Sequence, residues 1–463
     1  MVIYKNVHFK KWRERLVKKI LILLTVLAVV LSLCACATDG SNALKENDGR
    51  SEIGTTNNDN VDSEEINAPK PGMAPVTPRT QVPDGYVGIY TVEDLLKINA
   101  NKTMNYILMN DLDLSSYSDW QGLLNNAHFD GNGHTISNLR SEKSGLFDEC
   151  NMVTGLILKN VEINFKYLED RVLLPDFYIG AIANTIKGSL TNCYAEGYIS
   201  VRELSDDVCD IYMGGLVGYA ANAMISYCTN DVKVFYDTYE VCKNFIDTIC
   251  GGIVGSMCND NSGLISYCVN NADVYAYNYT DHDDGMWLDY HGICGGIVGE
   301  ATSNITIDSC VNSGDITGSA IASGIVASLT EKAYDKSCII ERCINSGKIE
   351  ISKEEGRVYP TYKLGHKASG ILGEINNSNC LVYLGACYNL GKICGDFKDA
   401  GSLVAYSKSD RINIRDCIYV NNSDYKENAL SMDGKGGMYP ESYNNKEISL
   451  TEAKEQFPQI FNN

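Results

Sequence analysis

The chain has 463 residues, of which 44% are hydrophobic, and this is enough apolar material for a large core, so disorder of the whole chain is excluded. Its formal net charge of −20 at pH 7 argues against a nucleic-acid-binding protein, which needs a basic surface to neutralise phosphates. We therefore expect no nucleic-acid partner.

The first 35 residues have the organisation of a bacterial export signal. A basic segment precedes an apolar run from Ile20 to Leu33, which is too short for a membrane span of about 20 residues. The run ends in Leu33-Cys34-Ala35-Cys36, which resembles the lipobox of bacterial lipoproteins. The resemblance implies cleavage before Cys36 and lipid attachment to it, and hence a location on the extracellular face of the cell membrane. The alternative is an uncleaved N-terminal anchor.

Residues 36–83 are rich in Asn, Asp, Ser, Thr, Glu and Pro and have almost no aromatic residue. Such a segment buries too little surface to offset the entropy of ordering it. We predict a disordered tether between the membrane and the folded part.

A block of five residues, small-small-apolar-apolar-small, then recurs seven times. The copies begin at Gly180, Gly214, Gly251, Gly295, Ser323, Ser369 and Gly401. A Cys follows every block, with Leu or Ile three residues before it. These cysteines are Cys193, Cys228, Cys268, Cys310, Cys343, Cys387 and Cys417. Six of the seven have Val or Ile six residues later, and five have Asn two residues later.

Each repeat is too short and too rich in β-branched residues for a helix pair, and its apolar runs are bounded by Gly, Asn and Asp, as in strands joined by turns. One repeat cannot bury its own apolar face, so successive repeats must stack as a solenoid. Stacking in register places Ile, Cys, Val and Asn each in a ladder. We expect the Asn residues to supply the left-handed turns between strands, and the glycines to allow positive φ or close backbone approach.

The blocks Gly214-Gly215-Leu216-Val217-Gly218 and Gly251-Gly252-Ile253-Val254-Gly255 resemble the GLUG-motif repeats of bacterial surface proteins. The segments from Tyr90 to Leu95, from Asn110 to Leu114 and from Phe129 to Ile136 are similar to theirs as well. The resemblance covers about residues 86–463 and implies an all-β fold, a right-handed parallel β-helix of the pectin-lyase-like kind. Thr91 and Asp94 predict the start of a short capping helix over residues 92–100.

The predicted organisation therefore has five parts. They are a signal peptide (1–35), the tether (36–83), an N-terminal cap with the first coils (84–178), the repeat β-helix (179–420) and a C-terminal cap or tail (421–463).

Export makes disulfides the default expectation for the cysteines. However, the seven repeat cysteines share the register of buried Ile and Val, where a Cys behaves as a small apolar residue. We therefore predict a reduced, buried stack. The chain has no Cys-x-x-Cys motif, so zinc-ribbon and thioredoxin-like sites lack their signature.

Candidate binding residues lie in one of four long, tyrosine-rich insertions that connect repeats, at residues 200–212, 235–249, 275–292 and 350–367. Insertions at one repeat position project from one side of a solenoid. In the third insertion, alternation from Val274 directs Tyr275, Tyr277 and Tyr279 outward together. The candidate ligand-binding residues are Tyr275, Tyr277, Tyr279, Asp283, Asp284, Trp287, Tyr290 and His291. They suit a surface glycan or a protein partner; alternatively, the segments pair as extra strands and bury the tyrosines on each other.

The leading function is a lipid-anchored cell-surface protein with a non-catalytic binding or adhesion face. The alternative is a polysaccharide lyase or glycoside hydrolase with its site in residues 275–292, because a glycosidase needs two carboxylates. No His-Glu-x-x-His, Gly-x-Ser-x-Gly or P-loop motif occurs, and we predict no catalytic residue and no cofactor. Calcium binding through Asp281, Asp283 and Asp289 is a minor alternative.

Overall fold

The computed structural model describes residues 71–166, 176–203, 210–237, 247–258, 263–277, 279–281, 288–302, 304–330, 337–352, 366–376, 380–394, 399–409, 411–420, 441–443 and 445–458. All of them belong to one structural unit, Ala68–Asn463. Within the described residues, no helix is long and apolar enough to cross a membrane.

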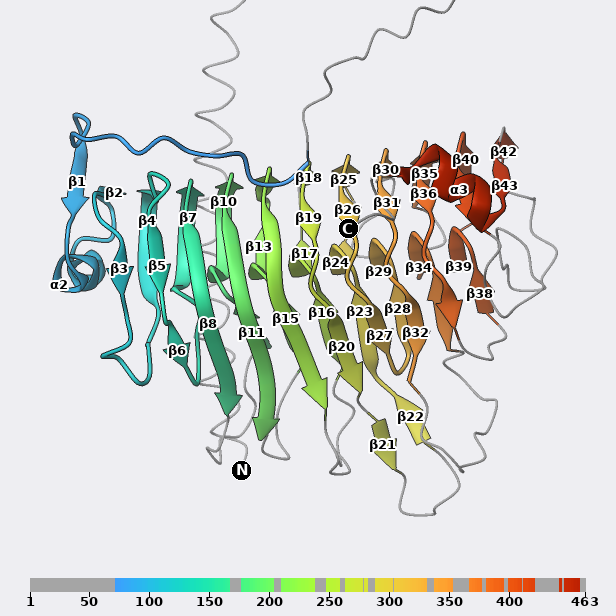
Figure 1. Ribbon diagram of the computed structural model, residues 1–463. Helices are drawn as coiled ribbons and strands as arrows, with labels where there is room; N and C mark the ends of the chain where they lie inside the picture. The colour runs from blue at the N-terminus through green and yellow to red at the C-terminus, as the bar shows by residue number, and fades with distance from the viewer. Residues whose placement is uncertain are drawn as a thin grey trace, which may run out of the picture. The chain divides into compact units, whose positions relative to one another are not determined.

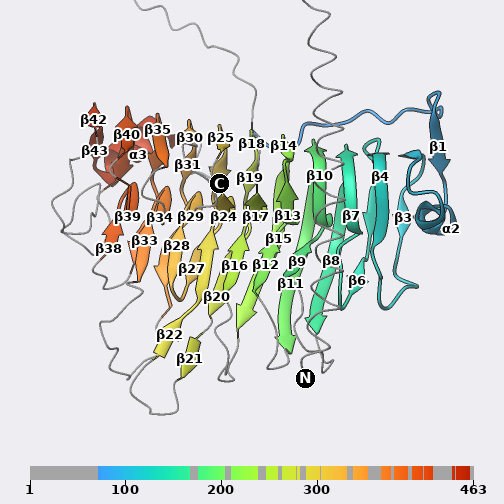
Figure 2. The same ribbon diagram turned by 180° about the vertical axis from the view of Figure 1, so that it is seen from behind.

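Three parallel sheets run along the molecule, and the chain passes through one strand region of each sheet in every coil of the central repeats (Figures 1 and 2). Sheet A has 18 strands. They are β1 (Tyr86–Ile89), β2 (Asn105–Leu108), β4 (Leu123–Asp130), β7 (Phe147–Thr154), β10 (Ala183–Thr191), β13 (Val217–Ala221), β14 (Met224–Ser226), β17 (Val254–Cys258), β18 (Gly263–Ser266), β24 (Val298–Thr302), β25 (Ile305–Asp308), β29 (Val326–Thr330), β30 (Ser337–Glu341), β34 (Leu372–Ile375), β35 (Leu381–Gly385), β39 (Val404–Ser407), β40 (Ile412–Arg415) and β42 (Glu441–Tyr443).

Sheet B has 16 strands and sheet C has seven. Sheet B consists of β3 (Leu112–Asp113), β5 (Thr135–Ser137), β6 (Arg140–Ser141), β8 (Ile157–Lys166), β11 (Tyr194–Glu203), β15 (Thr229–Asp237), β19 (Val269–Asn270), β20 (Val274–Tyr277), β26 (Val311–Asn312), β27 (Ile316–Gly318), β31 (Ile344–Asn345), β32 (Ile349–Ile351), β36 (Tyr388–Asn389), β37 (Ile393–Cys394), β41 (Ile418–Val420) and β43 (Lys446–Ile448). Sheet C consists of β9 (Phe177–Gly180), β12 (Ile211–Gly214), β16 (Thr248–Gly251), β23 (Gly292–Gly295), β28 (Ile321–Ser323), β33 (Lys367–Ser369) and β38 (Asp399–Gly401). The predicted parallel β-helix is confirmed.

Five short elements, in three places, stand outside the three sheets. The strands β21 (Tyr279–Asp281) and β22 (Leu288–Tyr290) form an antiparallel pair at the edge where sheet B leads into sheet C (Figure 1). Near the N-terminal end lie α2 (Val92–Leu96) and the 3-10 helix η1 (Lys97–Ala100), where the Thr91 side chain accepts a hydrogen bond from the Asp94 N–H as predicted. Near the C-terminal end, α3 (Leu450–Gln456) begins with a complete capping box of Ser449 and Glu452.

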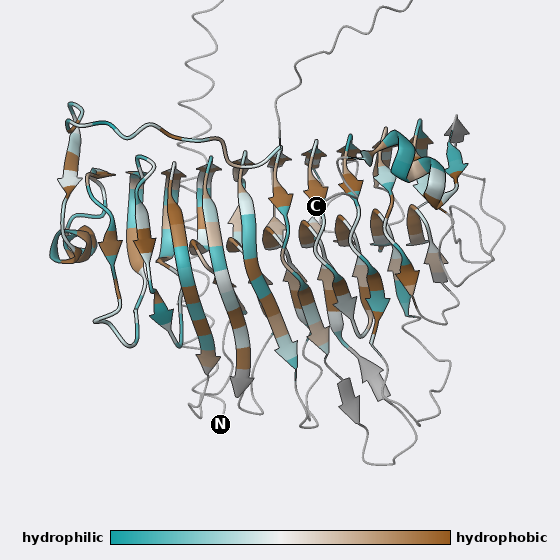
Figure 3. Ribbon diagram, viewed as in Figure 1, coloured by the Kyte–Doolittle hydropathy of each residue, from teal (hydrophilic) through white to brown (hydrophobic). Residues whose placement is uncertain are grey.

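The interior is a set of apolar rows that run along the axis. Apolar and polar residues alternate along the long strands of sheet B, so that one side of each strand faces inward (Figure 3). Val234, Val274, Ile316 and Ile349 are consecutive partners in one such row and are almost completely buried. The seven repeat cysteines form a second buried row, and the fourteen cysteines that the structure describes are all free thiols.

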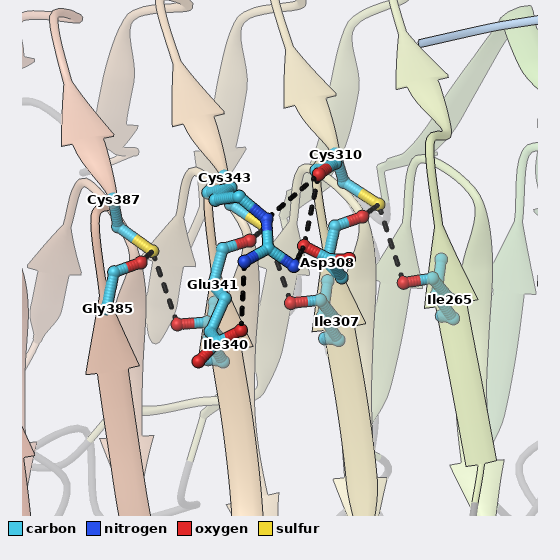
Figure 4. A network of polar contacts seen from close by, with 11 residues as sticks. Ile265, Ile307, Asp308, Cys310, Ile340, Glu341, Cys343, Gly385 and Cys387 are labelled. Carbon is cyan, nitrogen blue, oxygen red and sulfur yellow. Dashed lines mark hydrogen bonds and ion pairs between the residues drawn. The ribbon is translucent and has the colours of Figure 1, made fainter. Parts of the chain in front are cut away.

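Each thiol of the cysteine row points at the preceding coil (Figure 4). The Sγ atom of Cys310 lies 3.7 Å from the carbonyl oxygen of Ile265, and that of Cys343 lies 3.6 Å from the carbonyl oxygen of Ile307. Burial raises the pKa of the Cys228 and Cys268 thiols, which keeps them protonated and unreactive. The predicted reduced, buried stack is confirmed for the described residues.

The left-handed turns between sheets A and B do not use the repeated Asn, and that prediction was wrong. The residue with positive φ is the one directly before each repeat cysteine, which we call the turn row. Its members are Asn192, Tyr227, Tyr267, Ser309, Arg342, Ala386 and Asp416, with φ between 48 and 55°. A variety of side chains is tolerated there because they project outward from the turn.

The repeated Asn residues instead form a buried hydrogen-bonded ladder. Each side-chain amide donates to the amide oxygen of the next Asn, at 2.8 Å from Asn230 to Asn270 and at 2.7 Å from Asn270 to Asn312. The same amides also donate to the backbone carbonyl two residues later, for example from Asn270 to Ala272 at 2.9 Å. The ladder continues through Asn345 to Asn389. It thus satisfies buried polar groups inside an otherwise apolar solenoid.

The block glycines are required by close approach and not by positive φ. A Cβ atom on Gly252 would lie 2.1 Å from the carbonyl oxygen of Gly296 and 2.4 Å from the Cγ of Asn270. A Cβ atom on Gly218 would lie 2.4 Å from the backbone nitrogen of Ile179. The corner between sheets C and A is therefore too tight for side chains at these positions.

The last part of the predicted tether is not disordered. Residues 71–82 run in an extended conformation along the turn row and are hydrogen-bonded to it; we call them the strap (Figure 1). The sequence prediction failed here because the strap has no apolar core of its own and uses polar partners from four coils. The remainder of the tether, the signal peptide and Cys36 lie outside the described residues.

Candidate binding face

The structure describes three of the predicted binding side chains. Tyr275 and Tyr277 lie on β20 and are half-buried, whereas His291 directly precedes β23 and is buried. For Tyr279 and Tyr290 only the backbone is described, in the strand pair β21–β22. Asp283, Asp284 and Trp287 lie outside the described residues.

Tyr275 and Tyr277 point outward as the alternation predicts, because their neighbours Val274 and Ala276 are buried. Tyr275 stacks on Phe235 of the preceding coil, with ring centroids 4.9 Å apart and an interplanar angle of 12°. Phe235 is 45% exposed, so this pair forms a small aromatic step on the outer surface of sheet B.

Tyr277 has a different environment. It packs against a small lateral cluster of Ala320, Ile321 and Ala327, together with Ile293. Ile293 and Ile321 are paired residues on the outer surface of sheet C. Tyr277 therefore contributes to a second apolar cluster on the outside of the solenoid, and Tyr275 and Tyr277 do not form one continuous wall.

His291 belongs to a polar row that precedes the strands of sheet C. Its Nδ1 atom lies 3.0 Å from the carboxylate of Asp247, and the backbone N–H of Asp247 donates to the carboxylate of Asp210 at 3.0 Å. Burial raises the pKa of Asp210, and the negative charges of Asp247 and Asp176 act in the same direction. His291 thus has a carboxylate environment that the sequence analysis did not predict.

Beside this row, three tyrosines from sheets C and A gather at the corner between the sheets. Tyr178 stacks on Tyr212 at 5.2 Å between centroids, and Tyr219 lies 4.6 Å from Tyr178. The Tyr178 hydroxyl donates to the carboxylate of Asp176 at 3.3 Å. Asp176 is exposed and the three tyrosines are half-buried, so ring edges and hydroxyl groups reach the surface.

Carboxylates surround these rings. Burial, followed by the charges of Asp176 and Glu300 among others, raises the pKa of the Tyr178 hydroxyl, and burial with Glu300 and Asp210 raises that of Tyr212. Both hydroxyls therefore stay neutral and able to donate. We call this set the tyrosine–acid face; it comprises Asp176, Tyr178, Asp210, Tyr212, Tyr219 and Glu300.

Sequence reasoning missed the tyrosine–acid face, although a signal for it was present. Tyr178 and Tyr212 both stand two residues before a five-residue block and are direct partners in neighbouring strands. The signal was missed because Tyr212 also lies at the end of the insertion at residues 200–212, and this position was not compared between repeats. Flat rings with polar tips next to acceptors of hydrogen bonds can bind hydroxyl-rich or amine-bearing groups.

No group of three or more His, Cys, Asp or Glu side chains among the described residues is arranged to hold a metal ion. The side chains of Asp281, Asp283 and Asp289, named above for calcium, lie outside the part of the chain whose side chains are described.

A family profile of the GLUG motif matches residues 210–234. No curated protein gives a significant match. Among solved structures, the chain is similar to an IgA1 protease, with 16% identity and a TM-score of 0.42 over 79% of this chain and 24% of that chain. It is also similar to a candidate immunoglobulin A1 protease from Bacteroides ovatus, with 14% identity and a TM-score of 0.31 over 81% of this chain and 86% of that one.

The chain spans about a quarter of the length of the first of these structures. Likeness at this level does not bear on activity. The profile match describes one repeat in detail, because residues 210–234 include the block at Gly214, the repeat cysteine Cys228 and the ladder residue Asn230. The chain is thus a repeat protein with a GLUG motif, folded as a parallel β-helix.

Proposed function

We propose that this protein is a lipid-anchored cell-surface protein whose β-helix presents a non-catalytic binding face to a glycan or a protein. The anchor rests on the export signal and on the lipobox-like sequence that ends at Cys36. Replacement of Cys36 with Ala is expected to release the protein from membrane fractions. Unchanged retention with the full precursor mass would contradict a lipid anchor and favour an uncleaved one.

The observation that carries the binding role is the tyrosine–acid face. Stacked, half-buried rings of Tyr178 and Tyr212 are held rigidly by paired strands, so a ligand that covers them loses little additional side-chain entropy. Neighbouring carboxylates supply acceptors that fix the orientation of hydroxyl or amino groups.

The test replaces Tyr178 and Tyr212 with Ser and measures binding on a glycan array and to whole cells. Aromatic anchors contribute about 2 kcal/mol or more each, or roughly 30-fold in Kd. A matched control replaces Tyr227 and Tyr267 with Ser, since these rings also stack, at 4.9 Å, but on the turn row. Serine is tolerated there, because Ser309 occupies the same turn position. Equal losses in both variants would contradict a binding role for the tyrosine–acid face.

One observation favours the enzymatic alternative. Asp210, whose carboxyl has a raised pKa, lies beside Asp247, and a polysaccharide-cleaving enzyme needs a protonated carboxyl near a second carboxylate. Replacement of Asp210 with Asn separates the two functions. If the row is catalytic, the variant should lose depolymerisation of a substrate polysaccharide and still bind it. If the row only recognises, the unmodified protein should show no depolymerisation, and the variant should bind the glycan more weakly.

A further inference from the structure

The strap determines where the tether leaves the β-helix. Its first contact is the backbone N–H of Gly72, which donates to the carbonyl oxygen of Tyr267 at 2.7 Å. Tyr267 directly follows β18. Twelve strands of sheet A are stacked along the edge next to the turn row, one for each level of the solenoid, and β18 is the seventh of them. Six strands stand between this level and the N-terminal end, and five between it and the C-terminal end. The chain therefore reaches the solenoid at the middle of its length.

From there the strap runs back to the first level. Met73 donates to the Thr229 hydroxyl at 2.9 Å, and the backbone of Ala74 makes two hydrogen bonds with the side chain of Asn192, at 2.6 and 3.0 Å. Val76 then lies against Gly133, where a Cβ atom would be only 2.9 Å from the valine Cβ.

The strap ends at two buried polar side chains. The backbone of Arg79 makes two hydrogen bonds with the Asn132 side chain, at 2.7 and 3.1 Å, and the Arg79 guanidinium pairs with Asp130. Asn132 and Asp130 are almost fully buried, and Asn132 also donates to the Leu108 carbonyl at 3.0 Å. The strap is thus attached at both of its ends and between them.

The length of the strap fits its path. Six levels at about 4.8 Å each are roughly 29 Å, and the eleven residue-to-residue steps from Gly72 to Pro83 can span at most about 36–40 Å. Because four of the residues from 71 to 83 are proline, the strap also gives up little conformational freedom when it is extended.

The strap lies on the edge between sheets A and B, whereas the strand pair β21–β22 lies at the other end of the long strands of sheet B (Figures 1 and 2). We propose that the strap attaches the solenoid side-on to the membrane, with its two ends equally far from the anchor and the insertion-bearing edge directed outward. This inference rests on the proposed lipid anchor. The strap moves the point of attachment from the N-terminal end of the solenoid to its middle, so that every coil can reach a ligand.

The experiment uses the lipidated full-length protein in vesicles that contain an acceptor-labelled lipid. A donor dye is placed either at Val87, on the first level, or at Lys446, near the last level, both of which are exposed. Side-on attachment gives equal energy transfer from the two positions.

A second variant releases the strap by combining Arg79→Ala, Asn192→Gly and Thr229→Val. Glycine keeps the positive φ of Asn192 and removes only its side chain. Transfer from Lys446 should then fall below that from Val87, because the attachment point moves to the first level, about 50 Å from the last. A control with Arg140→Ala, Asn160→Gly and Thr317→Val changes the same residue types away from the strap and should leave the transfer equal.

Amide hydrogen exchange separates the failure of this inference from failure of the anchor. Side-on attachment is supported by two results together. The energy transfer is equal and becomes unequal when the strap is released, and the strap amides are protected from exchange at Gly72, Met73, Ala74 and Arg79. Unequal transfer in the unmodified protein overturns it. Strap amides that exchange like those of an unstructured peptide overturn it while the lipid anchor stands. Absence of the protein from the vesicles overturns the anchor, and side-on attachment with it.

Discussion

The buried Asn ladder makes a quantitative prediction about stability. Replacing Asn270 with Ala removes the donors to the Ala272 carbonyl and to the Asn312 amide oxygen, and it removes the acceptor for Asn230. Each buried polar atom left without a partner costs about 1–3 kcal/mol. The Asn230 amide nitrogen keeps its hydrogen bond to the Val232 carbonyl, so two atoms, the Ala272 and Asn312 oxygens, lose a donor. The expected destabilisation is about 2–6 kcal/mol, which is a large fraction of the stability of a typical domain.

Two variants serve as controls for this prediction. Asn389 stands at the end of the ladder, and its amide nitrogen has no hydrogen-bond partner among the described residues. Its replacement with Ala removes only one acceptor, for Asn345, and should cost about 1–2 kcal/mol. Asn271 is exposed and should cost less than about 1 kcal/mol when replaced with Ala.

The assay is urea denaturation followed by far-UV circular dichroism, with hydrogen exchange to locate the opening, because a solenoid can unfold in parts. The expected order of destabilisation is Asn270, then Asn389, then Asn271. If the Asn270 and Asn271 variants were equally stable, the ladder would be a by-product of stacking and the reasoning from unsatisfied partners would be refuted.

Three further changes follow from the same structure. Cys310→Ser should lower the free energy of unfolding by about 1–3 kcal/mol, because it places a hydroxyl in an apolar row; an unchanged urea midpoint would contradict a packing role for the thiol. Tyr277→Ser should destabilise by about 1–2 kcal/mol through loss of its apolar contacts, and Tyr275→Ser by less, as measured by melting temperature. The raised pKa of Asp210 means that the folded state disfavours its ionised form, so stability is lost as pH rises through that pKa. Asp210→Asn should therefore raise the melting temperature at pH 7 and leave it unchanged near pH 3, and the opposite pattern would contradict the burial of this carboxyl.

The repeat architecture was predictable because it depends on spacing. A Cys always stands three residues after Leu or Ile, and the side-chain period of a strand then fixes which residues face inward. Seven copies of that spacing determine both the stacking and the register. The burial of Cys310, and the outward direction of the residues on either side of it, could therefore be predicted from the sequence alone.

The roles of individual residues were less predictable, because they depend on atoms from other coils. Asn230 and Tyr227 are three residues apart, and propensity alone assigns the left-handed turn to the Asn. In the structure Tyr227 takes that turn, since Asn230 gains more from buried hydrogen bonds to the next coil. The strap escaped prediction for the same reason, because its partners, such as Asn132 and Asn192, lie 53 and 118 residues away from the strap residues that they bind.

The second glycine of the block and the ladder Asn vary together within this one chain. Where the Asn is present, the block has Gly, as in Gly296 with Asn312. The two flanking repeats have neither, since Ala181 accompanies Ala195 and Ser402 accompanies Tyr419. The physical reason is contact between the two positions in the same coil.

This pairing can be tested with a double-mutant cycle on Gly296 and Asn312. A Cβ atom on Gly296 would lie 2.4 Å from the Cγ of Asn312, so Gly296→Ala forces the ladder apart and should cost several kcal/mol. Asn312→Ala costs a similar amount through its lost hydrogen bonds. The double variant restores the combination found at Ala181 and Ala195, and it should be about 1–3 kcal/mol more stable than the sum of the single effects predicts. Additive effects in urea denaturation would show that the glycine is required only by the backbone of the next coil, and that the amide has no part in selecting it.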